Sequence, residues 1–111
     1  MNARILKSIL TVALLASTQL PLDARAADAG YNPEALAAAR EAGKTIVLDF
    51  HAPWCGTCRK QAATLSELAS DEALSEVVFL RVDFDKEKAL KKELKVGKQS
   101  TLVVFRGGQE V

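Results

Sequence analysis

The sequence predicts one small α/β domain, a mixed β-sheet with helices on both faces. The chain has 111 residues, a length that suits a single domain. Three short apolar runs rich in β-branched residues alternate with segments of helical periodicity. A helix between the first two strands favours their parallel pairing. Gly107-Gly108, after the third run, indicates a hairpin turn and therefore an antiparallel strand pair.

The first 26 residues are expected to lie outside this domain. Arg4 and Lys7 precede an apolar stretch over 8–20, and Ala24-Arg25-Ala26 follows it, a pattern typical of a secretory signal peptide cut after Ala26. An uncleaved membrane anchor is the alternative, but 8–20 is shorter than the roughly 20 residues that span a bilayer. We therefore expect the domain, residues 27–111, to be periplasmic or otherwise exported.

The domain is predicted to begin with a helix and a buried strand. Asn32 suits the N-cap position, Pro33 the first helical turn, and Gly43 the position just past the helix end. Residues 45–52 are apolar and β-branched on both faces, as expected of a central strand covered on both sides.

The rest of the chain alternates between the same two patterns. The spacing of apolar residues and the turn residues between them predict, in order, a helix over 56–69, a capped turn over 70–76, a strand over 77–84, a helix over 85–97 and a strand over 100–106.

Cys55 and Cys58, the only cysteines of the chain, follow the first predicted strand. A disulfide that closes so short a loop removes little chain entropy, so a purely structural role is disfavoured. A structural zinc site needs about four ligands, and His51 is the only histidine, so a metal site would require a second copy of the chain. A redox couple is the third interpretation, and the surroundings favour it.

The redox interpretation depends on the predicted helix that begins after Cys55. Unpaired N–H groups and the positive end of the helix dipole stabilise a thiolate there. Spacing of three residues along the helix brings Cys58 to the same side, within reach of a Cys55–Cys58 disulfide. We expect Cys55 to be the exposed attacking thiolate and Cys58, one turn deeper, to be the resolving thiol.

The stretch "VLDFHAPWCGTCRK" resembles the active-site strand, turn and helix of the thioredoxin family, with its W-C-x-x-C motif. The later stretches "FLRVDFDKE" and "LKVGKQSTLVVFRGG" are similar to the family in content and spacing. The resemblance covers about residues 33–111 and implies the thioredoxin-like fold. The segment "EALAAAREAGKTIVLDF" further resembles the thioredoxin-like domains of exported thiol-disulfide proteins.

The resemblance also implies roles for matching positions. Asp49 corresponds to the buried acid beneath the cysteine pair, which exchanges a proton with the resolving thiol. Trp54 corresponds to an exposed ring that covers the disulfide and touches substrate. The other positions expected to contact substrate are Gly56, Thr57, Gln99, Ser100 and Thr101. His51 we interpret as a polar residue at a strand end.

The sequence departs from the family pattern in three places. Ser100 stands where the family has a cis-proline, and because a cis bond before a non-proline residue costs about 3–4 kcal/mol, we expect a trans Gln99–Ser100 bond and a displaced loop. Gly56-Thr57 stands where typical members have Gly-Pro. The chain is expected to stop before the family's last strand and helix, which would leave 101–106 as an exposed edge.

Together these features predict a thiol-disulfide oxidoreductase that reduces disulfides of exported proteins through the Cys55/Cys58 cycle. A disulfide oxidase and a non-catalytic thioredoxin-like binding module are the alternatives. We expect electrons to come from a donor such as a membrane thiol transporter. No organic cofactor and no metal is expected. The nearly balanced charge, +1, gives no sign of a nucleic-acid partner, and we expect a monomer.

Overall fold

The computed structural model describes residues 29–111. The elements, in chain order, are α1 (Pro33–Glu41), β1 (Ile46–His51), α2 (Gly56–Ala69), the 3₁₀ turn η1 (Glu72–Leu74), β2 (Val78–Asp83), α3 (Lys88–Leu94), β3 (Leu102–Arg106) and β4 (Gln109–Glu110). The predicted signal peptide, 1–26, lies outside the described residues, so it and its cleavage after Ala26 remain predictions.

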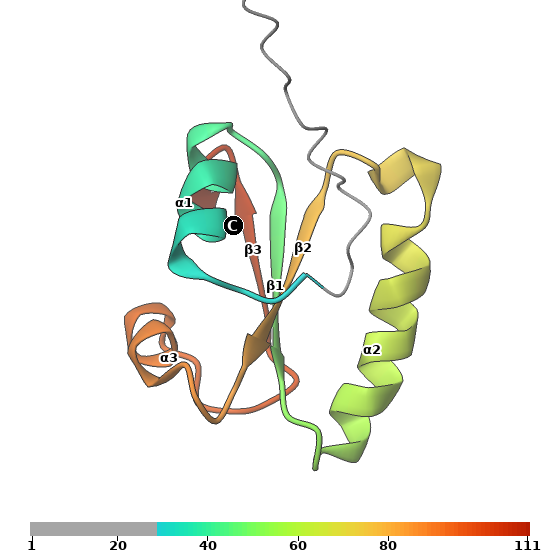
Figure 1. Ribbon diagram of the computed structural model, residues 1–111, viewed down its shortest axis with the longest axis vertical. Coiled ribbons are helices and arrows are strands. Elements are labelled where there is room, and N and C mark those ends of the chain that lie inside the picture. The colour runs from blue at the N-terminus through green and yellow to red at the C-terminus, as the bar shows by residue number, and fades with distance from the viewer. Residues whose placement is uncertain (1–28) are drawn as a thin grey trace, which may run out of the picture.

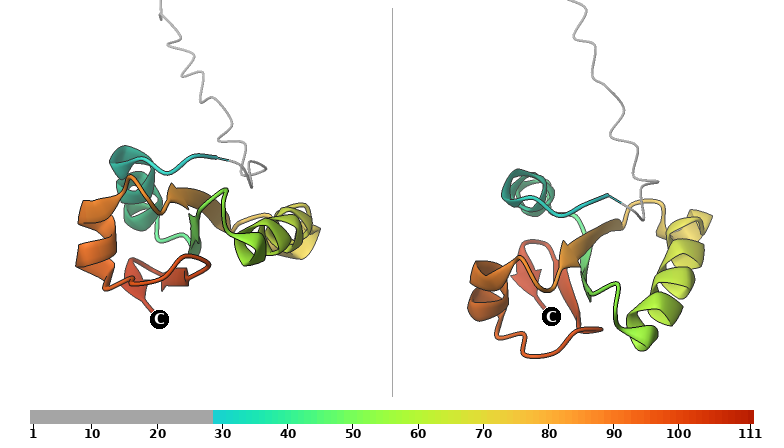
Figure 2. Two further views of the ribbon diagram at one scale, coloured as in Figure 1. Left: turned by 90° about the horizontal axis from the view of Figure 1, so that it is seen from below. Right: turned by 60° about the horizontal axis from the view of Figure 1, so that its bottom comes forward.

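The sheet is mixed and lies between two layers of helices. Its strand order is β2-β1-β3-β4, with β1 parallel to β2 and antiparallel to β3. Helices α1 and α3 cover one face and α2 covers the other, as Figures 1 and 2 show from three directions. The predicted fold class is confirmed.

Alternation along β1 explains how one strand serves both layers. Ile46, Leu48 and Phe50 are completely buried and belong to a core that includes Leu36 of α1 and Leu90 of α3. Because successive side chains of a strand point to opposite faces, the residues between them, Val47 and Asp49 among them, face the α2 layer. There Val47 packs with residues of α2 and β2. Asp49 is thus a polar side chain placed on a covered face.

Local capping residues fix both ends of α1 and the start of η1. The Asn32 side chain accepts a hydrogen bond from the Ala35 N–H at 2.7 Å, and Pro33 opens α1, as predicted. Gly43, just past this helix, has φ 66°, a conformation that glycine adopts without strain. After α2, the Asp71 side chain accepts from the Ala73 N–H and caps η1, which confirms the predicted capped turn.

Helix α3 is shorter than the predicted helix over 85–97. Its start is delayed because the Asp83 side chain accepts hydrogen bonds from the N–H groups of Asp85 and Lys86, at 3.0 and 3.1 Å, and so forms a turn before the helix. Its end comes early because Lys95 adopts a left-handed conformation, φ 57°. Gly97 is therefore not the residue that ends the helix.

The carboxyl-terminal residues correct the expectation that the chain stops before another strand. Strand β4 pairs antiparallel with the end of β3, and the Val111 N–H donates to the Val104 carbonyl at 2.9 Å. The second half of β3 is therefore covered, and the exposed edge expected over 101–106 is reduced to its first residues.

The opposite edge of the sheet is extended by the segment before α1. Gly30 forms a parallel bridge with Arg81 of β2, supported by hydrogen bonds from Tyr31 N–H to the Arg81 carbonyl and from Arg81 N–H to the Ala29 carbonyl. The sheet thus includes residues that precede the stretch covered by the resemblance. Within residues 29–111, none of the helices is long and apolar enough to cross a membrane.

Candidate active site

The end of β1 and the start of α2 bring the two cysteines together. Cys55 is the N-cap of α2 and has an extended conformation, φ −94° and ψ 117°. Its Sγ accepts a hydrogen bond from the Cys58 N–H at 3.2 Å, as a serine or aspartate oxygen does at other N-caps. Its own N–H donates to the Ala52 carbonyl at 3.1 Å. The helix start therefore directs a backbone donor at the first sulfur.

Both cysteines are buried, and the expected exposure of Cys55 was wrong. Cys55 is 7% exposed and Cys58 is completely buried. The pair forms a small cluster with Ala52, against which Phe84 packs, and the Ser100 hydroxyl adds a polar contact to both sulfurs. The structure shows the pair as free thiols, its dithiol state, so the Cys55–Cys58 disulfide remains a prediction.

Hydrogen bonds lower the pKa of the Cys55 thiol from 9.0 to about 7. The largest contribution is the hydrogen bond from the Cys58 side chain, followed by that from the Ser100 hydroxyl; the backbone N–H groups of Cys58 and Thr57 add smaller ones. Each bond stabilises the thiolate, and together they outweigh the opposing effect of burial. A substantial fraction of Cys55 is therefore ionised at neutral pH.

Alkylation of the reduced protein should distinguish the two cysteines. We expect iodoacetamide to modify Cys55 at least about tenfold faster than Cys58 at pH 7, because Cys55 is ionised and Cys58 is completely inaccessible. The rate at Cys55 should rise through a midpoint at about pH 7. Peptide mass analysis after short exposures measures both rates, and equal rates at the two sites would contradict this assignment.

Asp49 lies on β1 beneath α2 and is 5% exposed. Burial raises the pKa of this carboxyl, and the nearby charges of His51 and Arg81 oppose the rise. Arg81 Nε lies 3.9 Å from Asp49 Oδ2, while Oδ1 is buried and has no hydrogen-bond partner. Such an acid can hold or release a proton closer to neutral pH than an exposed aspartate does.

The sequence analysis did not identify Arg81 as part of this site. The structure places it there through strand register, because Asp49 of β1 and Arg81 of β2 are direct partners in the parallel ladder. The signal was a basic residue among the apolar residues of the predicted strand over 77–84, because a charge among buried neighbours requires a partner.

The loop before β3 carries the strongest departure from the family pattern. The Gln99–Ser100 bond is trans, as predicted: no peptide bond of the described residues is cis. Ser100 has φ 65°, in the left-handed region. Its N–H donates to the Phe50 carbonyl at 2.8 Å, and the Phe50 N–H donates to the Thr101 carbonyl at 3.0 Å. These bonds hold the loop against the end of β1.

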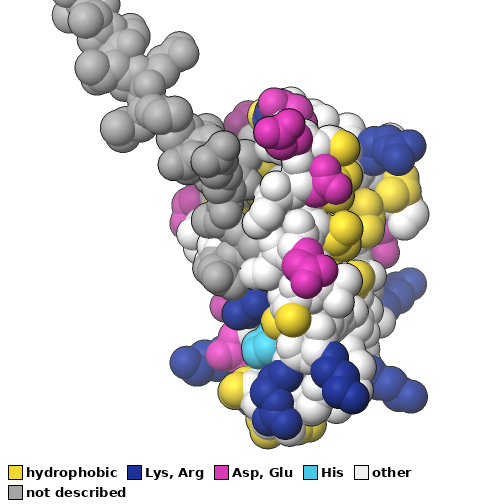
Figure 3. Space-filling model, turned by 90° about the vertical axis from the view of Figure 1, so that its right-hand side faces the viewer, with side chains coloured by type: hydrophobic (Ala, Val, Ile, Leu, Met, Phe, Trp, Pro, Cys, Tyr) yellow, Lys and Arg dark blue, Asp and Glu magenta, His cyan; other side chains and the backbone are white. Residues whose placement is uncertain are grey.

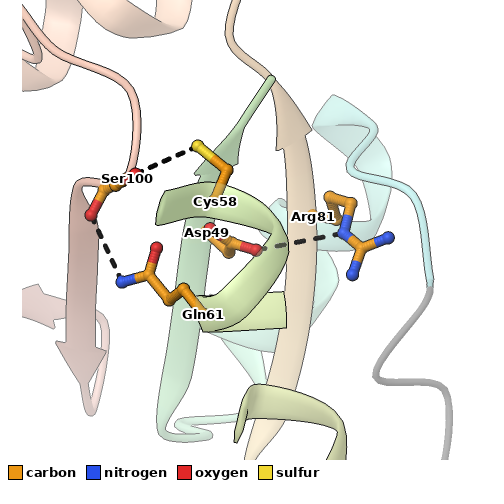
Figure 4. Close-up of polar contacts among 5 residues, drawn as sticks. All are labelled: Asp49, Cys58, Gln61, Arg81 and Ser100. Atoms are coloured by element: carbon orange, nitrogen blue, oxygen red, sulfur yellow. Dashed lines mark hydrogen bonds and ion pairs between the residues drawn. The ribbon is translucent and has the colours of Figure 1, made fainter. Parts of the chain in front are cut away.

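The Ser100 side chain reaches the cysteine pair. Its Oγ lies 3.0 Å from Cys58 Sγ and 3.4 Å from Cys55 Sγ. On its other side, Gln61 of α2 donates from Nε2 to the Ser100 carbonyl at 3.3 Å, and Figure 4 shows how Ser100 lies between Gln61 and Cys58. The sequence analysis missed Gln61, although its position three residues after Cys58 places it on the same side of the helix.

The other predicted substrate-contact residues are chain neighbours of Cys55 or of Ser100. The Trp54 ring is 60% exposed, and its Nε1–H donates to Asp85 Oδ2 at 2.9 Å. Gly56 and Thr57 are exposed in the first turn of α2. Gln99 is half-buried in the loop, and the Thr101 hydroxyl donates to the Lys98 carbonyl at 2.7 Å. Among residues 29–111, no three His, Cys, Asp or Glu side chains gather as a metal ion would require.

Comparison with known proteins identifies the family. The sequence profile of thioredoxin matches residues 29–111. Among curated relatives, the chain is 42% identical over 73 residues to a thioredoxin H-type of Fagopyrum esculentum, covering 66% of this chain and 61% of the relative. It is 35% identical over 78 residues to a thioredoxin of Echinococcus granulosus, covering 70% of this chain and 71% of the relative. Against a third, thioredoxin H-type 1 of Nicotiana tabacum, it covers only 55% of the relative.

Solved structures agree with this assignment. Trxlp from Edwardsiella tarda superposes with a TM-score of 0.72 at 34% identity, covering 74% of this chain and 80% of the other. Thioredoxin NaTrxh from Nicotiana alata gives a TM-score of 0.63 at 26% identity, covering 70% and 66%. The chain therefore belongs to the thioredoxin family.

Proposed function

We propose that this protein is a thiol-disulfide oxidoreductase that reduces disulfide bonds of exported proteins. The observation that carries the proposal is the cysteine pair at the start of α2. Cys55, with a pKa of about 7, supplies a thiolate at neutral pH, and Cys58 lies one helical turn away as a buried thiol. The membership of the chain in the thioredoxin family supports the same chemistry.

The proposed cycle has two exchange steps. The Cys55 thiolate attacks one sulfur of the target disulfide, a Cys55–target bond forms, and the other target sulfur leaves as a thiolate that takes a proton from water. Cys58 then loses its proton and attacks Cys55 Sγ; the Cys55–Cys58 bond forms, and the second target sulfur leaves as a thiolate that also takes a proton from water. The target gains two electrons and two protons, and the protein ends as a disulfide.

Asp49 is proposed to accept the proton that Cys58 loses. Its carboxyl is covered by α2, and the raised pKa that follows from its burial makes proton uptake easier near neutral pH. The unpartnered Oδ1 supports this role, because no donor stabilises the negative charge at this buried oxygen, and protonation removes that charge.

The surface around Cys55 suits a protein target. The exposed Trp54 ring offers an apolar contact, and the backbone of Gln99 has no hydrogen-bond partner within the described residues, so it is available to an extended segment of the target. Lys and Arg side chains gather at the lower end of the face in Figure 3, where α2 begins and where Arg59 and Lys60 are exposed. Targets with acidic residues beside the disulfide are therefore favoured.

An insulin-reduction assay tests the activity. With dithiothreitol as electron source, the protein should accelerate the precipitation of insulin chains, whereas a binding module would leave the rate unchanged. Equilibration with glutathione then gives the reduction potential, which separates a reductase from an oxidase.

Cell fractionation with thiol trapping tests the export. The proposal requires processed protein outside the cytoplasm, with Cys55 and Cys58 kept reduced by a donor such as a membrane thiol transporter.

Asp49→Asn should slow insulin reduction about 100-fold at neutral pH, the lower end of the range for general acid–base catalysis. The asparagine fits the same space but cannot take the proton from Cys58. The exposed cap variant Asp71→Asn is the control, because asparagine caps a helix as well as aspartate does, and it should retain full activity. Unchanged activity of Asp49→Asn between pH 6 and 9 would limit Asp49 to a structural role.

The same variant should change how stability depends on pH. Because burial raises the folded-state pKa of Asp49 above its unfolded value, the ionised carboxylate disfavours folding. This destabilisation of the folded state is absent below 3.8, the ordinary pKa of the carboxyl, and becomes complete as pH rises through the pKa that Asp49 has in the folded protein. Asp49→Asn should therefore unfold at higher urea than wild type at pH 7 and at the same urea near pH 3, with about 1.4 kcal/mol for each unit of raised pKa.

A further inference from the structure

We propose that the Ser100 hydroxyl is a hydrogen-bond donor that the two sulfurs use in turn, first the Cys55 thiolate and then the Cys58 thiolate, and that Gln61 positions it. The proposal rests on the exchange cycle described above and assigns a residue of that cycle. A proline at this position would carry no hydroxyl, so this hydrogen-bonding role depends on the serine itself.

The distances place one donor between two acceptors. Ser100 Oγ is within hydrogen-bond distance of both sulfurs, 3.4 Å from Cys55 and 3.0 Å from Cys58. A hydroxyl has one proton to donate, so it can serve only one sulfur as a donor at a time, while its lone pairs remain free to accept from the other. In the dithiol state the hydroxyl can therefore donate to the Cys55 thiolate, which also receives the Cys58 S–H.

Burial makes this donor difficult to replace at Cys58. Cys55 Sγ also receives the Cys58 N–H, but Cys58 is completely buried, and within residues 29–111 Ser100 is the one side chain besides Cys55 that hydrogen-bonds with its sulfur. Water does not reach it as a substitute. A thiolate at Cys58 would otherwise be a buried charge with no donor, which is costly.

The Ser100 hydroxyl changes its partner between the two steps of the exchange cycle. Once Cys55 Sγ is bonded to the target it carries no charge and needs no donor. Cys58 then gives its proton to Asp49, and the Ser100 O–H turns to the new Cys58 thiolate. That thiolate attacks Cys55 Sγ, the Cys55–target bond breaks, and the electron pair leaves on the target sulfur.

The loop around Ser100 is fastened tightly enough to fix the hydroxyl. The Ser100 N–H bonds to the Phe50 carbonyl, and the Ser100 carbonyl accepts from Gln61 Nε2. Gln61 and Cys58 both belong to α2, so the helix that carries the resolving thiol also holds the loop. Gln61 touches neither sulfur; it is a positioning residue.

Titration of the thiolate ultraviolet absorbance tests the first half of the proposal without any substrate. Ser100→Gly and Ser100→Ala should both raise the midpoint for Cys55 from about 7 by about one pH unit. Glycine adopts φ 65° without strain, so this variant remains informative if the alanine variant folds poorly. Ser75→Ala, at an exposed serine outside the site, is the matched control and should titrate like wild type.

Release of a small aromatic thiol from a preformed mixed disulfide on Cys55 tests the second half. Ser100→Gly should slow the release about tenfold at pH 7 and move its pH profile to higher pH, because the Cys58 thiolate loses its donor. Gln61→Met keeps the volume of the side chain but removes the amide, and it should shift both profiles in the same direction by a smaller amount.

The outcomes separate this proposal from the function it rests on. Unchanged titration in both Ser100 variants would overturn the role at Cys55, and unchanged release would overturn the role at Cys58. A wild-type protein that fails to reduce insulin, while its Ser100 variants still shift the titration, would refute the proposed function and leave the donor role standing. An active wild type with unshifted variants would refute the donor role alone.

Discussion

Cys55→Ser should lower the rate of insulin reduction by at least about 1,000-fold, to the uncatalysed background. The serine hydroxyl stays protonated at neutral pH, whereas the hydrogen bonds at the start of α2 bring the pKa of the Cys55 thiol to about 7. No other cysteine in the chain can take over the first attack, because Cys58 is completely buried. The measurement is the initial rate of insulin precipitation at a fixed dithiothreitol concentration.

Cys58→Ser should abolish turnover by a different route. The first exchange still occurs, but no thiol remains to resolve it, so the protein should accumulate as mixed disulfides with its targets. Non-reducing gels of cells that produce the variant would show these adducts, and reductant would release them. Adducts formed by Cys55→Ser instead of Cys58→Ser would reverse the assigned roles, and full turnover by either variant would contradict the dithiol cycle.

The features that follow from neighbouring residues could be predicted from the sequence. The N-cap of α1, the glycine after it and the cysteine pair at the start of α2 each depend on a few consecutive residues. The order of helices and strands, and thus the fold class, followed from periodicity. The parallel pairing of β1 with β2 followed from the helix between them.

The features that depend on contacts between distant residues could not be predicted. Ser100 meets Cys58 across 42 positions of the chain, and only the folded loop brings its hydroxyl to the sulfur. The burial of Cys55 has the same origin, because the loop that carries Ser100 lies against it. Arg81 lies beside Asp49 because of the register between β1 and β2, and sequence periodicity does not predict a register. The early end of α3 depended on Lys95 adopting an uncommon backbone conformation.

Phe50→Ala should lower the free energy of unfolding by about 3–5 kcal/mol, the usual cost of removing a fully buried aromatic side chain. Phe50 is completely buried in the core between the sheet and the layer of α1 and α3. The free energy of unfolding of a small domain is only about 5–15 kcal/mol in total, so this loss would be a large part of the stability of the domain. Urea unfolding of residues 27–111, followed by circular dichroism, measures the change.

Two further variants show whether the loss comes from the core. Leu102→Ala shortens a side chain that is 40% exposed on β3, so it should cost less than about 1 kcal/mol. Phe50→Leu keeps most of the apolar volume and should fall between the two. The backbone of Phe50 holds the loop by bonding to the Ser100 N–H and the Thr101 carbonyl, and neither alanine nor leucine at position 50 removes these backbone groups. The folded fraction of each variant should therefore keep the Cys55 titration of the wild type. A shifted titration in folded Phe50→Leu would mean that the side chain, and not only the backbone, sets the position of the Ser100 hydroxyl.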